Sequence, residues 1–128
     1  MPKVLGVDYG RKKIGLATAT STLAEAYRVI RSESIKEAVN KIKKIVEEEE
    51  IGKVVIGISE GEMAEETKRF AGELAKELEV EIVFQDETLS TKVAQDLSIE
   101  ANVPKKKRKE MEDAFAAAII LQSYLDSF

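Results

Sequence analysis

Apolar residues along the first part of the chain follow the period of β-strands. The β-prone residues 4–7 lead into Asp8 and a tight turn at Gly10, and residues 14–18 then predict a strand that pairs back on the first. Residues 27–31 alternate as a third strand would. These three segments predict an antiparallel meander at the start of the fold.

Helical and strand patterns alternate in the next part of the chain. Ser34 followed by Glu37 is a capping-box pattern, and apolar residues then recur at helical spacing through the glutamates at 47–50. This pattern predicts one amphipathic helix that ends near Gly52. Residues 54–58 are a continuous apolar run, typical of a strand buried on both faces, and we expect this strand at the sheet centre.

A second helix and a last strand follow. The helix is predicted by one apolar face, made of Phe70, Ala71, Leu74 and Leu78. Residues 80–84 alternate as a strand that stops at residues 85–87. Strands that alternate with helices after a meander predict an α/β fold with one mixed sheet.

The remainder of the chain predicts two helices separated by a loop. A short helix carries Val93, Ala94 and Leu97, and a basic loop interrupted by Pro104 follows it. The last helix has a wide apolar face from Met111 onward, and we expect Asp113 in its first turn. With 128 residues, the chain is long enough for one domain, residues 1–128, and too short for two ordinary ones.

Composition limits the chemistry that this chain can perform. It contains no cysteine and no histidine, which excludes disulfides, thiolate nucleophiles, zinc sites of the usual kind and an imidazole base. Catalysis would therefore use carboxylates, hydroxyls, lysines and bound metal. No apolar run reaches membrane-spanning length and no leader pattern is present, so we expect no membrane contact and a cytoplasmic protein.

Acidic residues stand at the ends of three predicted elements. Asp8 follows the first strand, Asp86 and Glu87 follow the last, and Asp113 starts the last helix. Because sites in open sheets gather at strand ends, these acids can converge. Oxygen ligands without histidine or cysteine suit Mg²⁺ or Mn²⁺, and two such ions support phosphodiester hydrolysis.

Each acid also has a structural explanation that the sequence leaves open. Asp8 can cap its own turn, and Asp86 with Glu87 can cap the next helix. Asp113 can interact with the dipole of its helix.

Basic residues gather at two places. The predicted loop carries five adjacent cations and the turn after Asp8 carries three more: Lys105, Lys106, Lys107, Arg108, Lys109, and Arg11, Lys12, Lys13. Beside an acidic cluster, such cations can hold a phosphate backbone, whereas a lone charge run is more typical of a solvated loop. The net charge of −4 argues against indiscriminate nucleic-acid binding, so local patches decide this question.

Four segments together resemble the YqgF (RuvX) family, in order and from end to end. They are Gly6-Val7-Asp8-Tyr9-Gly10-Arg11-Lys12-Lys13-Ile14-Gly15-Leu16-Ala17, Val55-Ile56-Gly57-Ile58, Asp86-Glu87-Thr88-Leu89-Ser90-Thr91, and residues 113–125. The resemblance implies a ribonuclease-H-like mixed five-stranded sheet with helices on both faces. It also implies that Asp8, Glu87 and Asp113 match the catalytic, metal-binding acids of the family.

Two positions depart from the family pattern. Thr88 stands where the family usually has arginine, which removes an expected phosphate contact. Glu60 follows the apolar run at 54–58 where the family usually has a Leu-Pro pair and a polar loop. Related resolvases carry an acid at the end of this central strand, so the resemblance implies Glu60 as a second candidate, ranked below Glu87, for the metal-binding role.

The resemblance leads to several functional hypotheses. The first is a metal-dependent nuclease that cleaves structured nucleic acid and processes the 5′ end of pre-16S rRNA. The second is a Holliday-junction resolvase, which would act as a homodimer on branched DNA rather than as a monomer. The third is a non-catalytic nucleic-acid-binding module, favoured by the arginine replaced at Thr88. The pair Asp8 and Gly10 also resembles the phosphate loop of actin-like ATPases, but those enzymes need two such domains.

Overall fold

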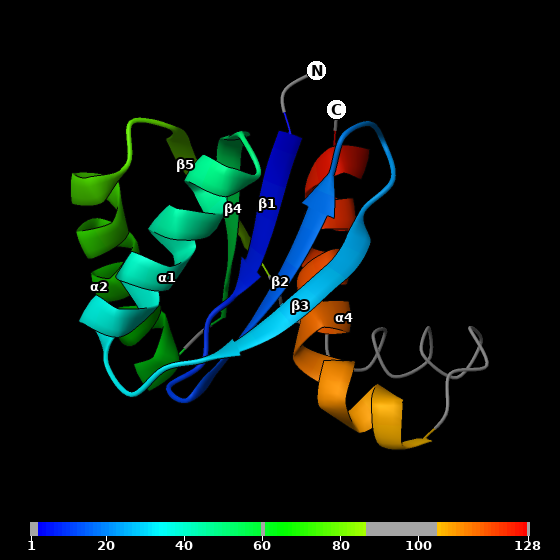
Figure 1. Ribbon diagram of the computed structural model, residues 1–128, viewed down its shortest axis with the longest axis horizontal. Coiled ribbons are helices and arrows are strands. Elements are labelled where there is room, and N and C mark those ends of the chain that lie inside the picture. Colours follow the sequence, from blue (N-terminus) through cyan, green and yellow to red (C-terminus); the bar gives the residue numbers. More distant parts are fainter. Residues whose placement is uncertain (1–2, 60, 87–104, 128) are drawn as a thin grey trace.

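The computed structural model describes residues 3–59, 61–86 and 105–127, and side chains in the last helix from Glu110 onward. Figure 1 shows these elements along the chain. In order they are β1 (Lys3–Asp8), β2 (Lys13–Ala19), β3 (Glu25–Arg31), α1 (Ile35–Glu48), β4 (Ile51–Ile58), α2 (Glu62–Glu77), β5 (Glu81–Asp86) and α4 (Lys105–Asp126). The short helix expected around Val93 lies outside the described residues.

The strands form one mixed five-stranded sheet in the order β3-β2-β1-β4-β5. The β1–β2 and β2–β3 pairs are antiparallel, which confirms the predicted meander, and β1–β4 and β4–β5 are parallel. The expectation that β4 is the central strand was wrong, because β1 holds that place. A continuous apolar run indicates only that both faces of a strand are buried. A strand next to the central one meets the same condition, so the run could not identify which strand is central.

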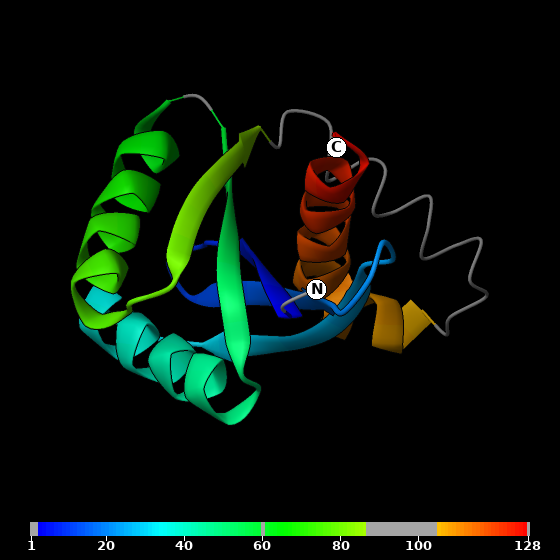
Figure 2. The same cartoon turned by 90° about the horizontal axis from the view of Figure 1, so that it is seen from above.

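Helices cover both faces of the sheet, as the resemblance implied. In Figure 2, α1 and α2 lie on one side of the strands and α4 lies on the other. The larger core lies on the α1–α2 side and includes Leu5, Val7, Leu16, Ile42, Val54, Ile56, Phe70 and Leu74. The smaller core lies under α4 and includes Val4, Ala17, Val55, Ala117, Ile120 and Leu121. The sheet is therefore the middle layer of three.

Helix α1 begins where the sequence predicted and ends earlier. Glu37 donates its backbone N–H to the Ser34 side chain over 3.1 Å, which confirms the cap. The Glu37 carboxylate accepts from the backbone N–H of Glu33, one residue before the capping position. The helix stops at Glu48, not near Gly52, because Glu50 takes a positive φ of 54° and the buried Ile51 already belongs to β4.

Helix α4 begins at Lys105, so the basic segment is helical and the predicted loop was wrong. Lysine and arginine are good helix formers, and a run of them contains nothing that stops a helix. Asp113 therefore lies in the third turn of α4 rather than in its first turn. The helix dipole falls off within the first turn, so it no longer explains this acid. None of the helices in the described ranges is long and apolar enough to cross a membrane.

Candidate active site

Asp8 is directed toward the α4 side of the sheet. Val4, on the same strand, belongs to the core under α4, and a Cβ atom on Gly6 would lie 2.8 Å from Cβ of Leu121. Side chains two residues apart on a strand share a face. Asp8, the last residue of β1, therefore faces α4 together with Val4 and Gly6.

Gly15 brings the α4 backbone against the sheet beside Asp8. It is the register partner of Asp8 in the antiparallel β1–β2 pair, where partner Cα atoms lie about 4.5–5.5 Å apart. A Cβ atom on Gly15 would lie 1.8 Å from the carbonyl oxygen of Asp113, so only glycine permits this approach. Gly15 therefore neighbours both acids: Asp8 lies beside it on the adjacent strand, and the backbone of Asp113 packs against it from α4.

The carboxyl group of Asp113 is partly buried at this place. Burial raises the pKa of Asp113, the nearby Lys13 lowers it, and Glu112 raises it, with burial the largest of these causes. Lys13 is two residues from Gly15 on β2, so it shares the face that meets α4. A carboxylate that burial destabilises favours an additional positive charge, either from a cation or from a proton.

The C-terminal ends of β1, β4 and β5 lie at the same edge of the sheet, because these strands are parallel. Ile58 and Asp86 are register partners at this edge, and Asp86 is exposed. The predicted acid Glu87 and its alternative Glu60 lie outside the described residues. Within the part of the chain that the structure describes, no group of three or more acidic side chains could hold a metal ion.

The three cations predicted in the β1–β2 turn have different surroundings. Arg11 donates its Nε–H to Glu66 of α2 over 2.7 Å, although its side chain remains 63% exposed. The backbone of Lys12 accepts from the N–H of Ser32, which fixes the turn to the end of β3. Lys13 begins β2 and lies near Asp113, where its positive charge lowers the pKa of the Asp113 carboxyl.

Tyr9 and Glu66 connect the β1–β2 turn to α2, and the sequence did not indicate this contact. The Tyr9 ring stacks on Phe70 with centroids 4.6 Å apart, and its hydroxyl donates to Glu66 over 3.3 Å. Glu66 also accepts from Arg11, which lowers the pKa of the Glu66 carboxyl. Glu66 is one of several acids on α2, and nothing in the local sequence distinguishes it. Its role depends on how α2 packs against the turn that follows β1.

The pKa of Tyr9 gives a test of this contact. Burial, followed by the Glu66 carboxylate, raises the pKa of Tyr9 to about 12. Because the folded state favours the neutral phenol, the resulting stability is complete below about pH 10 and is lost as the pH rises through 12. Absorbance at 295 nm is expected to show one of the three tyrosines ionising near pH 12. Tyr9→Phe should remove that step.

Glu66→Gln is the informative variant in the same titration. Removing the carboxylate should shift the late ionisation step to lower pH, because the neutral amide no longer opposes the phenolate. An unchanged step in Glu66→Gln would show that Glu66 does not act on Tyr9.

Comparison with known proteins adds to this geometry. The sequence model of the RuvX family, described as Holliday junction resolvase, matches residues 2–127. The chain belongs to the RuvX family. Membership confirms the resemblance that the four sequence segments indicated, and it makes the chain a nuclease that hydrolyses phosphodiester bonds.

Two bacterial relatives match the chain along almost its whole length. A protein of Carboxydothermus hydrogenoformans is 41% identical over 132 residues, covering 97% of this chain and 96% of the relative. One from Caldanaerobacter subterraneus is 40% identical over 134 residues, covering 98% and 96%. Both carry the name "Putative pre-16S rRNA nuclease".

Two solved structures share the fold of this RuvX chain. T. thermophilus RuvC in complex with Holliday junction substrate matches with a TM-score of 0.68 and 14% identity, covering 99% of this chain and 96% of RuvC. The fowlpox virus resolvase in complex with Holliday junction DNA matches with a TM-score of 0.67 and 15% identity, covering 98% and 97%. These neighbours confirm the predicted ribonuclease-H-like architecture.

Proposed function

We propose that Asp8, Glu87 and Asp113 form the catalytic site of a metal-dependent nuclease. The observation that supports this proposal is the contact of α4 with Gly15, which brings Asp113 to the end of β1 beside Asp8. Glu87 joins them in the proposal because it follows Asp86 directly, and Asp86 ends β5 at the same edge of the sheet.

The residues at this edge fit a hard divalent cation. Asp8 and Asp113 offer oxygen ligands only, and the chain has no histidine or cysteine that would favour zinc. Burial disfavours the charged form of Asp113, so a cation beside it would be stabilising. Asp8, Glu87 and Asp113 would hold Mg²⁺ or Mn²⁺, which supplies an activated water for phosphodiester hydrolysis when bound.

The proposed substrate is the 5′ end of pre-16S rRNA, as the names of the two relatives suggest. Phosphate contacts would come from Arg11, Lys12 and Lys13 in the turn and from the basic start of α4. That segment comprises Lys105, Lys106, Lys107, Arg108 and Lys109, in the same helix as Asp113. Lysine and arginine contacts to phosphates position a substrate without reading its sequence. A ribosomal RNA substrate would place the protein in the cytoplasm.

A second candidate function is resolution of four-way DNA junctions. It is favoured by the family description and by the fold shared with RuvC. Symmetric cleavage of a junction would require a homodimer that presents two sites, whereas a monomer would suffice for trimming RNA.

One cleavage experiment separates these functions. A labelled pre-16S leader and a synthetic four-way DNA junction are incubated with the protein in Mg²⁺, in Mn²⁺ and in EDTA. We expect metal-dependent cutting of the RNA and none in EDTA. Paired symmetric nicks in the junction would instead favour the resolvase. Binding without cleavage of either substrate would favour the non-catalytic module, and Thr88→Arg would then test whether the arginine of the family pattern restores activity.

A further inference from the structure

A basic groove lies between the edge strand β3 and helix α1, apart from the acidic site. Its lining includes Arg28 and Arg31 from β3, Lys41 and Lys44 from α1, and the carboxylate of Glu48. Four cations line it against the carboxylate of Glu48 and that of Glu37, which pairs with Lys41 from the neighbouring turn, a local positive excess in a chain whose net charge is −4. We refer to this surface as the β3–α1 groove.

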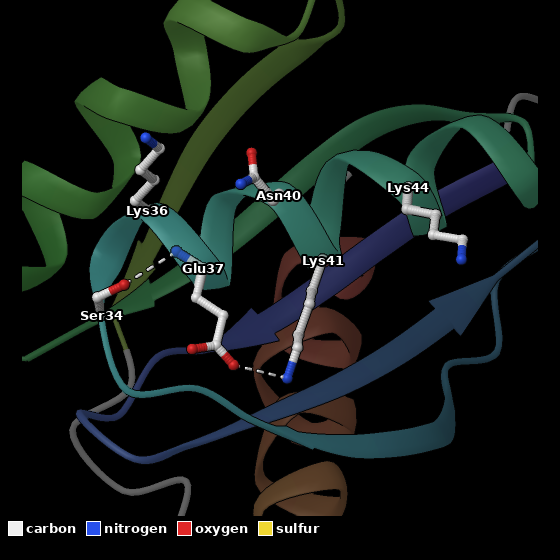
Figure 3. A pocket seen from close by; sticks show the side chains of 6 residues that line it. All are labelled: Ser34, Lys36, Glu37, Asn40, Lys41 and Lys44. Atoms are coloured by element: carbon white, nitrogen blue, oxygen red, sulfur yellow. Dashed lines mark hydrogen bonds and ion pairs between the residues drawn. The ribbon is translucent and has the colours of Figure 1, made fainter.

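A neighbouring hollow on α1 extends the basic surface toward the start of that helix. Lys41 and Lys44 line both depressions, and Lys36 adds a further cation to the second. Figure 3 shows Lys41 reaching from α1 with its ammonium group beside Glu37, an ion pair of 3.0 Å. Both partners are more than 40% exposed, so solvent screens this pair and weakens it.

The cations that line the groove are held in place, and their positive charges are only partly balanced by nearby carboxylates. Arg28 stacks its guanidinium 4.6 Å from the centre of the Tyr27 ring, and this contact leaves its charge intact. Lys41 donates to the backbone carbonyl of Arg31, which connects α1 to β3 across the groove. The carboxylate of Glu48 lies 3.9 Å from Lys44, at the limit of an ion pair.

The groove starts at the edge of the sheet that carries the acids. Arg31 is the register partner of Lys13 in the β2–β3 pair, and Lys13 lies near Asp113. The N–H of Ser32 donates to the carbonyl of Lys12 over 3.0 Å, so the end of β3 is fixed to the β1–β2 turn that follows Asp8. Register partners share a face, so the Arg31 side chain lies on the α4 face with Lys13. Arg28 instead lies on the α1 face with the buried Ile30. Cations therefore continue from the acidic site, past Arg31, around the edge strand and into the groove.

We propose that the β3–α1 groove binds the phosphodiester backbone of the nucleic-acid substrate beyond the cleavage site. This inference rests on the proposed function. Arg28 and Arg31 are three residues apart on the edge strand, about 10 Å, and their side chains lie on opposite faces, so together they span the edge. A nucleic-acid strand carries one phosphate per nucleotide, so this span, together with the lysines of α1, would meet about two or three successive phosphates. Arginine binds phosphate with a paired set of N–H donors, and lysine acts as a point charge.

Protection of the edge strand is the competing explanation. Charged side chains on an exposed edge prevent strands of other molecules from pairing with it. That explanation predicts self-association when the charges are removed and no change in nucleic-acid affinity. The two explanations therefore differ in what a charge-removing variant does.

The test is a binding titration on the full chain carrying Asp8→Asn, in EDTA, so that cleavage does not interfere. The groove variant combines Arg28→Gln, Arg31→Gln and Lys44→Gln, and it retains Lys41 because Lys41 connects α1 to β3. The matched control removes three surface cations that pair with acids of α2 and do not line the groove, through Lys43→Gln, Lys68→Gln and Lys76→Gln. Fluorescence anisotropy of a labelled pre-16S leader is measured from about 50 to 200 mM salt.

The groove variant is expected to bind roughly tenfold to a hundredfold more weakly at about 0.1 M salt. The slope of log K against log salt should become shallower by about two, because three phosphate contacts are lost. The control should keep most of the affinity and the slope, since it removes the same net charge elsewhere. Sedimentation and a thermal melt confirm that each variant remains folded and report any self-association.

Equal affinity and slope in the groove variant and the control would overturn the proposal. Self-association of the groove variant with unchanged affinity would also overturn it and would support edge protection. Cleavage by the wild-type chain is measured separately. A wild-type chain that binds but does not cut would count against the proposed nuclease site, while the comparison of the two variants still decides the role of the groove.

Discussion

Asp8→Asn is expected to abolish cleavage and to leave the fold unchanged. The substitution keeps the shape of the side chain but removes the negative charge that would hold a divalent cation beside Asp113. A metal ion contributes several kcal/mol of stabilisation to a phosphoryl transition state, so cleavage should fall by about a thousandfold or more. Initial rates with the RNA leader at saturating Mg²⁺ measure this effect, and circular dichroism checks the fold.

Asp126→Asn is the matched control for Asp8→Asn. Asp126 is also an aspartate and ends α4, where it accepts a hydrogen bond of 2.9 Å from Gln122. The asparagine oxygen can still accept this bond, so the rate of cleavage should not change. Full activity in Asp8→Asn would remove Asp8 from the mechanism, whatever the control shows.

Gly15→Ala is expected to have the largest effect on stability. The added Cβ atom would lie 1.8 Å from the carbonyl oxygen and 2.1 Å from the carbonyl carbon of Asp113. These are backbone atoms, so no side-chain rotation relieves the overlap and α4 must move off the sheet. Overpacking of this kind should lower the free energy of unfolding by about 3 kcal/mol or more. Because Asp113 moves with the helix, cleavage should fall as well.

Gly72→Ala provides the control for the same chemical change. Gly72 lies inside α2, and a Cβ atom there would meet nothing within 4 Å. Alanine is the better helix former, so this variant should gain about 0.5–1 kcal/mol. Urea unfolding followed by circular dichroism measures both variants. A Gly15→Ala protein as stable as wild type would show that α4 does not rest on this glycine.

Local sequence patterns were sufficient to predict most of the secondary structure. The two-residue alternation of the first strands and the helical spacing after Ser34 depend on neighbours along the chain, and the sheet and α1 confirm them. Composition alone also restricted the possible chemistry. A chain without histidine and cysteine has carboxylates, hydroxyls and lysine amines as its main groups for catalysis and metal binding. The roles of Asp8, Glu87 and Asp113 stay predictions that rest on the family resemblance.

Contacts between distant segments decided the rest. The backbone of Asp113 packs directly against Gly15, and Arg11 forms an ion pair with Glu66. Nothing near these residues in the sequence indicates their partners. The basic segment after Pro104 had the composition of a loop, yet it continues the helix that packs on the sheet. Hydrophobic periodicity reports which face of an element is buried. It does not report which element covers that face or how closely two backbones approach, because packing between segments sets both.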